Sequence, residues 1–181
     1  IMPLGEGELI EGIDDSKKLK PEERERLAAL IRERAIAYKI CEESNETIDR
    51  INILEATRLC MKRAVEGLAV QPDVVFTDGN FRLQTDLPQQ NIVRGDALSY
   101  TIGAASILAK VYRDALMCEY DKLYPQYGFA VHKGYGTKRH TDAIREYGLC
   151  KIHRRTFTKK FWEGAESGAP QNSSAPSDTK S

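Results

Sequence analysis

Short apolar segments alternate with longer helical patterns along this chain, and this alternation strongly limits the folds that it can adopt. The clearest short segment is 73–77, Asp-Val-Val-Phe-Thr, which is typical of a strand buried on both faces of a sheet. The turn sequence Asp78-Gly79-Asn80 ends it, and a second short strand is expected at 91–94. Strands that alternate with helices predict an α/β domain.

The helical segments carry recognisable start and stop signals. Pro21, followed by two acidic residues, begins one helix. Either Ser44 or Asn45 caps a second helix, which Gly67 ends. The other expected elements are a strand at 35–41, a helix from 97 or 98 to 123, and a helix over 137–147.

The chain has 181 residues, enough for one domain with a core, which we expect to span residues 1–162. Residues 163–181 are rich in Gly, Ser, Ala and Pro and predict a disordered tail. The sequence begins with Ile1, so we expect a trimmed N-terminus, and it shows no signal-peptide pattern.

Composition excludes several classes of protein. No apolar run is long enough for a membrane helix, so no membrane association is expected. The four cysteines are far apart and lack the C-x-x-C spacing of zinc and redox sites. Free thiols in a reducing cytoplasm are therefore the favoured interpretation.

The formal net charge of zero hides a basic segment near the C-terminus. Residues 131–160 hold nine Lys and Arg against two acidic residues, a net charge of +7, and all three histidines of the chain. Such crowding is typical of a surface that binds a phosphate backbone, and a merely solvated basic face is the open alternative.

Two aspartates follow the predicted strands directly. Asp78 ends the first strand, and Asp96 follows the second through a glycine. Catalytic groups collect at strand ends in α/β sheets, and two carboxylates held together there favour a hard cation such as Mg²⁺ or Mn²⁺. Paired cations of this kind suit phosphodiester hydrolysis. The alternatives are a local turn for Asp78 and a helix cap for Asp96.

Three further segments carry groups suited to nucleic acid. In 132–137, Lys133 and Tyr135 lie on a glycine loop before a helix start, where phosphate binding and base or sugar stacking are possible. Arg154 and Arg155 could clamp phosphates, and Ser16 with Lys17 precedes the first helix. A core tyrosine, solvated arginines and an ordinary helix-entry loop are the respective alternatives.

Taken together, these segments resemble the ribonuclease HII family along almost the whole ordered chain. The matching stretches, in the family's order and spacing, are Asp15-Ser16-Lys17-Lys18-Leu19, 48–54, Thr77-Asp78-Gly79-Asn80, Arg94-Gly95-Asp96, 104–111, 127–129, 132–137 and 153–157. The resemblance implies a ribonuclease H-like fold, a mixed sheet flanked by helices. It also implies metal-dependent cleavage of RNA–DNA hybrids, or of duplex DNA 5′ of an embedded ribonucleotide. Separately, we expect a monomer.

The resemblance also implies roles for individual residues. Asp78 and Asp96 match two of four metal-binding carboxylates, and Tyr135 matches the ring that senses the 2′-hydroxyl of the ribonucleotide. Arg94 stands where the family often has lysine. Ser16, Lys17, Lys133, Arg154 and Arg155 are the other expected substrate contacts.

One part of the family pattern is absent from this sequence. The family's first strand carries an Asp-Glu pair followed by Gly-Arg-Gly, whereas this sequence begins with Ile1-Met2-Pro3, which looks like the end of the second strand. Glu6, Glu8 and Glu11 do not replace the missing pair. We therefore expect little cleavage by this chain alone, an exposed core face and a low midpoint of urea unfolding.

Two other functions stay open at this point. A module that binds duplexes without cutting them would use the same basic segment. Ser106 and Lys110, four residues apart on one helix face, could act as nucleophile and base, although tight helix packing explains them more simply.

Overall fold

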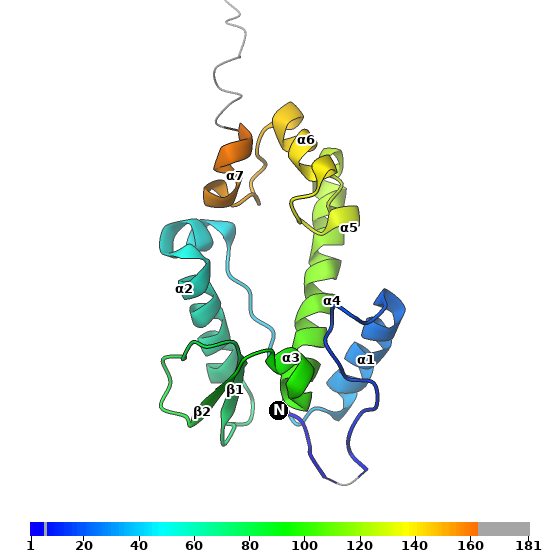
Figure 1. Ribbon diagram of the computed structural model, residues 1–181, viewed down its shortest axis with the longest axis vertical. Helices are drawn as coiled ribbons and strands as arrows, with labels where there is room; N and C mark the ends of the chain where they lie inside the picture. Colours follow the sequence, from blue (N-terminus) through cyan, green and yellow to red (C-terminus); the bar gives the residue numbers. More distant parts are fainter. Residues whose placement is uncertain (6, 163–181) are drawn as a thin grey trace, which may run out of the picture.

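The computed structural model describes residues 1–5 and 7–162, so the predicted tail 163–181 lies outside the described residues. The longest element is helix α4 (Tyr100–Leu123), and Figure 1 shows it running along the long axis of the molecule. Helix α1 (Pro21–Arg34) packs against its first half, and a group of short helices packs against its second half. This one helix therefore connects both ends of the molecule.

The first two helices begin where the sequence predicts. Pro21 occupies the first position of α1. Helix α2 (Asn45–Glu66) is capped by Ser44, whose side chain accepts a hydrogen bond from the Thr47 amide. The sequence did not predict a kink at Asn52, where φ is 68° and the side-chain oxygen caps the helical turns that follow.

Two parallel strands form the sheet of the described residues, and the α/β class is confirmed. Strand β1 (Val75–Asp78) pairs with β2 (Gln89–Ile92), and Asp78 lies opposite Ile92. Both strands were predicted within about two residues of these bounds. Antiparallel neighbours, which a mixed sheet would need, do not occur in the part of the chain that the structure describes.

The predicted strand at 35–41 is wrong. This segment contains no assigned strand, and its backbone contacts with the N-terminus are two hydrogen bonds, from the Ile1 amine to the Ala37 carbonyl and from the Ile36 amide to the Ile1 carbonyl. Its apolar residues are those of a strand, but a strand also needs a partner of several residues.

The predicted long helix is divided in two. Helix α3 (Gly95–Leu98) forms a single turn, and Ser99 interrupts it with φ −122° before α4 begins.

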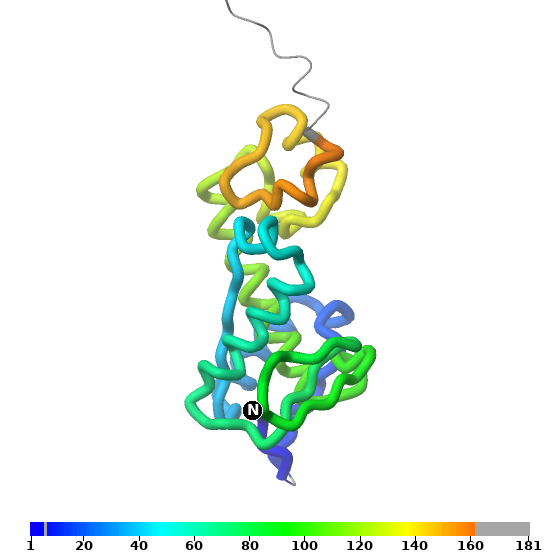
Figure 2. Tube along the Cα trace, turned by 90° about the vertical axis from the view of Figure 1, so that its left-hand side faces the viewer, coloured from blue at the N-terminus to red at the C-terminus, as the bar shows by residue number. Residues whose placement is uncertain are grey.

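The upper end in Figure 1 adds a 3₁₀ turn (Pro125–Tyr127) and helices α5 (Phe129–His132), α6 (Lys138–Tyr147) and α7 (Arg155–Trp162). Figure 2 shows α6 and α7 closing this end, far from the N-terminal residues. No described helix combines the length and apolar character needed to cross a bilayer.

The buried apolar side chains form two clusters along α4. The first joins α1 to the first half of α4 through Leu27, Ile31 and Ile107. The second joins Met117 of α4 to Tyr127, Phe129 and residues of α6.

Open grooves remain between the two sides of the molecule. An apolar groove of about 440 Å³ lies between segment 35–41, α2 and α4. It shares Ile40, Cys41 and Ala109 with a larger groove of about 880 Å³ that reaches α6 and α7. The side of α4 opposite α1 is therefore only partly covered by the described residues.

Candidate metal and nucleic-acid site

The structure brings Asp78 and Asp96 to the same edge of the sheet. Oδ1 of Asp78 accepts a hydrogen bond of 2.8 Å from the Gly95 amide, and Asp96 is the next residue. The bond joins residues 17 apart in sequence, so Asp78 does more than form a local turn. Asp96 lies within the turn of α3, and Ser99 is the N-cap of α4, so the capping alternative for Asp96 is not observed.

Glycine at position 95 permits this close approach. A Cβ atom there would lie 2.5 Å from Cδ1 of Ile102 and 3.5 Å from Cα of Asp78. A larger residue would push α3 away from the strand end and separate the two carboxyl groups. The packing of one backbone on another thus fixes the aspartate pair.

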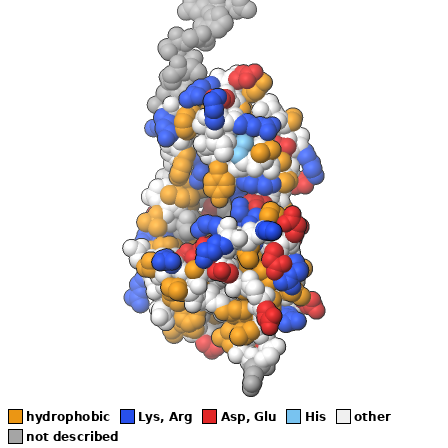
Figure 3. Space-filling model, turned by 45° about the vertical axis from the view of Figure 1, so that its right-hand side comes forward, with side chains coloured by type: hydrophobic (Ala, Val, Ile, Leu, Met, Phe, Trp, Pro, Cys, Tyr) orange, Lys and Arg blue, Asp and Glu red, His pale blue; other side chains and the backbone are white. Residues whose placement is uncertain are grey.

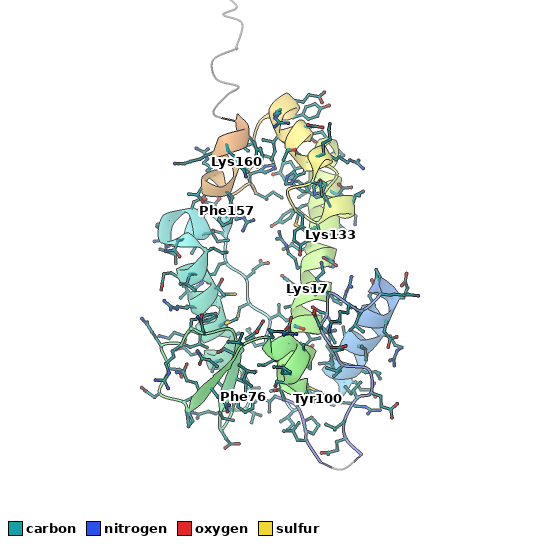
Figure 4. The ribbon with its side chains drawn as sticks, viewed as in Figure 1. Lys17, Phe76, Tyr100, Lys133, Phe157 and Lys160 are labelled. Atoms are coloured by element: carbon teal, nitrogen blue, oxygen red, sulfur yellow. The ribbon has the colours of Figure 1, made fainter. Side chains whose placement is uncertain are left out.

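Lys17, which the sequence predicted to contact substrate, lies beside Asp96 of this pair. Its ammonium lies 3.6 Å from Oδ2 of Asp96, while most of the Lys17 side chain is exposed. Figure 4 shows Lys17 beside α4, close to α3. The neighbouring Ser16 is buried, and its carbonyl accepts a hydrogen bond from the Arg24 guanidinium.

A chain of charged side chains connects this loop to Tyr135. Arg24 donates to the carbonyls of Ser16 and Leu19 and pairs with Asp114 at 3.6 Å. Asp114 also accepts a 2.7 Å hydrogen bond from Lys110, whose ammonium lies 5.6 Å from the centre of the Tyr135 ring. Arg24 and Asp114 were not predicted, because their partners are distant in sequence.

Tyr135 is exposed, which excludes the core alternative for this residue. Its side chain is 64% exposed on the loop between α5 and α6. The ring lies beside Lys110 of α4. Lys133 adopts a left-handed conformation and donates to Sγ of Cys118, so its ammonium is directed at α4.

The arginines predicted to contact substrate are not all near the aspartates. Arg94 is exposed next to Gly95, with φ 60°. Arg154 packs on the Phe157 ring at 3.9 Å, and burial lowers the pKa of its guanidinium. Arg155 lies on α7, at the opposite end of the molecule from α3 (Figure 1).

Asp49 of α2 holds the start of α7 in place. Its carboxylate accepts hydrogen bonds from the amides of Arg155 and Thr156 and from the Thr156 hydroxyl. Burial opposes ionisation, but these hydrogen bonds lower the pKa of the Asp49 carboxyl below its ordinary value. No sequence signal pointed to this cap, because the partners are over 100 residues apart.

Only some of the side chains in the basic segment 131–160 are exposed. Figure 3 shows Lys and Arg side chains gathered over the upper end of the visible face, with mixed charges below. The three histidines of this segment are buried, however, with exposures of 5–6%. Their inclusion in a phosphate-binding surface is therefore wrong. The apolar face shared by His140, Ala143 and Ile144 at helical spacing could have indicated burial of one of them.

The alternative pairing of Ser106 with Lys110 is not observed. The Ser106 hydroxyl donates to the Gly103 carbonyl, and the Lys110 ammonium donates to Asp114. Lys110 therefore has no contact with Ser106 that could deprotonate it.

The chemistry of the aspartate pair fits a hard divalent cation. Carboxylate oxygens are the usual protein ligands of Mg²⁺ and Mn²⁺, and a hydrogen bond to Oδ1 leaves the second oxygen of Asp78 for another ligand. The described residues contain no group of three or more His, Cys, Asp or Glu side chains placed to hold a metal. Within residues 1–5 and 7–162, two carboxylates are therefore the protein ligands at this edge. All four cysteines are free, as predicted.

Comparison with known proteins assigns the family. The sequence model of the family described as Ribonuclease HII matches residues 9–163. The chain is 49% identical over 152 residues to Ribonuclease HII of Pelodictyon phaeoclathratiforme, covering 83% of this chain and 74% of that protein. It is 53% identical over 149 residues to Ribonuclease HII 1 of Methylibium petroleiphilum, covering 82% and 75%. The match to Ribonuclease HII of Desulfitobacterium hafniense is also 53% identical, and it covers 81% of this chain but 56% of that protein.

Solved structures support the fold. The ribonuclease H2 of Pyrococcus horikoshii aligns with a TM-score of 0.70 at 23% identity, covering 86% of this chain and 79% of that one. The ribonuclease HII in the PCNA complex of Archaeoglobus fulgidus aligns with a TM-score of 0.63 at 22% identity, covering 81% and 78%. With the family match over most of the sequence, these alignments confirm the predicted ribonuclease H-like fold. This chain belongs to the ribonuclease HII family, a family of ribonuclease H enzymes.

Proposed function

We propose that this chain provides two carboxylates and the substrate-sensing loop of a metal-dependent endonuclease. The enzyme cuts the RNA strand of RNA–DNA hybrids and cuts duplex DNA 5′ of embedded ribonucleotides, leaving a 3′-hydroxyl and a 5′-phosphate. The observation that carries the proposal is the hydrogen bond between the Gly95 amide and Asp78, which sets Asp78 beside Asp96 at one sheet edge.

Each group at this edge has a task that follows from its chemistry. Asp78 and Asp96 would hold Mn²⁺ or Mg²⁺, which activate a water molecule and stabilise the leaving oxygen when bound. Lys17, already paired with Asp96, lies where it can contact a phosphate that approaches the carboxylates. Tyr135, held over Lys110, presents an exposed ring for the ribonucleotide sugar.

The basic side chains of α7, at the upper end in Figure 1, would provide a second set of contacts with the phosphates of the duplex. Helix α7, which carries Arg155, Lys159 and Lys160, lies far along the long axis from α3, so a bound duplex would span much of the molecule (Figures 1 and 4). Their contacts with phosphates would be independent of sequence and sensitive to salt.

We further propose that the 181-residue chain alone cleaves little. The described residues offer two carboxylates at the edge of a two-stranded sheet. Two ligands hold a pair of cations poorly, since each needs about six oxygen ligands. We place the protein in the cytoplasm as a monomer, with residues 1–162 as one catalytic domain acting in ribonucleotide removal.

A nicking assay tests the activity. The 181-residue chain and a form that carries in addition the first strand of a ribonuclease HII relative are each incubated with Mn²⁺ and a duplex that carries one ribonucleotide, beside an Asp78→Asn variant of the extended form. We expect the extended form to nick the duplex, its Asp78→Asn variant to have lost this nicking, and the 181-residue chain to nick little. Nicking that survives Asp78→Asn would contradict the assignment of the site.

A non-catalytic duplex-binding module is the second candidate, and the basic upper end favours it. This alternative predicts salt-sensitive duplex binding with no nicking by any form of the protein. An Arg155→Ala variant would then weaken binding to ribonucleotide-containing and all-DNA duplexes equally and reduce the salt slope by about one.

A further inference from the structure

The three histidines of the chain form one buried, hydrogen-bonded stack behind the Tyr135 loop. The rings of His132 and His140 stack with centres 4.4 Å apart, and those of His140 and His153 with centres 5.3 Å apart. Phe129 contacts all three rings. The stack thus belongs to the second apolar cluster and is shielded from water.

The backbone donors around the stack fix where each ring carries its proton. The Cys150 amide donates to Nδ1 of His153, so the proton of His153 is on Nε2. That proton is donated to Nε2 of His140 over 3.1 Å, which leaves the proton of His140 on Nδ1. The Gly134 amide donates to Nδ1 of His132, whose Nε2 proton is donated to the Tyr127 carbonyl. All three rings are neutral in this pattern.

Two of the rings hold the backbone on either side of Tyr135. Nδ1 of His140 donates to the Tyr135 carbonyl over 3.0 Å. His132 accepts from the Gly134 amide through its ring and from the Tyr135 amide through its own carbonyl. Both polar backbone groups of Tyr135 are therefore bonded to histidines, while its ring remains exposed. Gly134 makes the tight turn between them, with φ 81°.

Burial disfavours protonation of His140 and His153, and cationic side chains lie near the stack. Arg113 of α4 lies beside Gly134, and Arg154 follows His153 directly. The Cys150 thiol, 3.1 Å from Nδ1 of His153, has a pKa raised by burial and is neutral. Burial lowers the pKa of His140, and it lowers that of His153 to about 4.

We propose that His132 and His140, aligned by His153, are positioning residues that fix the backbone of Tyr135 so that its exposed ring meets the ribonucleotide sugar. The proposal rests on the assignment of Tyr135 under the proposed function. It extends that assignment to three buried side chains that do not touch the substrate. Neutral imidazoles suit this task because each provides one donor and one acceptor in fixed directions.

Hydrogen exchange tests the clamp without any nucleic acid. His140→Leu removes the donor to the Tyr135 carbonyl, whereas His140→Asn keeps an amide donor near the position of Nδ1. The Gly134 amide donates to His132, and the Thr137 amide donates to the same Tyr135 carbonyl as His140 does. We expect these two amides to exchange roughly tenfold faster in the leucine variant and at near-parent rates in the asparagine variant. Unchanged exchange in His140→Leu would overturn the proposal.

A control separates this effect from a general loss of stability. Ile144 is buried on the same helix and in the same cluster and forms no side-chain hydrogen bond to the loop. Ile144→Ala should therefore speed exchange throughout the upper cluster without singling out Gly134 and Thr137. Selective loosening of the loop in this control would count against a specific histidine clamp.

Duplex binding tests the functional half of the proposal. The ratio of affinities for a duplex with one ribonucleotide and an all-DNA duplex is measured by fluorescence anisotropy at neutral pH. We expect His140→Leu to lower this ratio by roughly three- to tenfold, with all-DNA binding within about twofold, and His140→Asn to restore it. A parent-like ratio in the leucine variant would overturn the proposal. If the parent chain binds both duplexes equally well, the proposed function fails. The hydrogen-exchange data then decide by themselves whether the histidines hold the Tyr135 backbone.

Discussion

The two ends of α4 are stabilised in different ways. At the end near α3, two aspartates lie at the edge of a two-stranded sheet, and an open apolar groove runs between the first half of α4, α2 and segment 35–41. At the other end, Tyr127, Phe129 and three buried histidines pack together and form hydrogen bonds, and Phe129, His140 and His153 also line the larger groove. Hydrogen bonds between buried side chains stabilise the histidine end, whereas a single backbone amide holds the aspartate pair at the other end. Substitutions should therefore have unequal effects at the two ends.

The largest expected effect is the loss of Phe129, which is 2% exposed and contacts every ring of the histidine stack. Phe129→Ala should lower the free energy of unfolding by about 3–5 kcal/mol, measured by urea unfolding. The matched change in the groove wall is Met61→Ala, which should cost only about 1 kcal/mol because this side chain is only partly buried. Equal losses would remove the contrast between the two ends.

The second largest effect should be a loss of stability in acid, through the buried histidines. The folded pKa of His153, about 4, lies below its unfolded value of 6.5, so its contribution to stability is complete above pH 6.5 and is lost as pH falls toward 4. The loss should reach roughly 2–3 kcal/mol over this window. Urea midpoints measured across this range check the prediction, with His153→Gln as the control expected to flatten the curve. A parent midpoint that does not change between pH 6.5 and 4 would contradict it.

The smallest effect should come from the contact that joins the two sides of the molecule. Asp49→Ala removes the cap of α7 and should cost about 1 kcal/mol. Duplex affinity should also fall, because α7 carries basic side chains whose placement depends on this cap. Asp142→Ala provides a control, since Asp142 forms exposed ion pairs within its own helix and its loss should be nearly neutral. Equal effects of the two substitutions would show that α7 does not need the cap.

Local signals were sufficient where the structure depends on neighbouring residues. Pro21 and Ser44 marked helix starts correctly, and the apolar run before Asp78 marked a strand. The segment 35–41 has equally good strand residues but lacks a paired neighbour, so its local pattern was misleading. The division at Ser99 escaped prediction because the close approach of Gly95 to β1 is a tertiary constraint.

The candidate site shows the same division. Asp78, Asp96, Lys17 and Tyr135 could be selected from the sequence, because strand ends, glycine loops and a family resemblance all point to them. Arg24, Asp114 and Asp49 could not be selected, because their partners lie far away along the chain.

The sequence by itself determined the α/β class, most helix positions and the identity of the residues that could bind metal and nucleic acid. These depend on side-chain chemistry and on patterns within a few residues. Tertiary structure alone decided that the histidines are buried, that Lys110 faces Tyr135, and that one backbone amide ties the two aspartates to a single edge. Hydrogen bonds and burial act between atoms that are close in space, and separation along the chain does not reveal which atoms those will be.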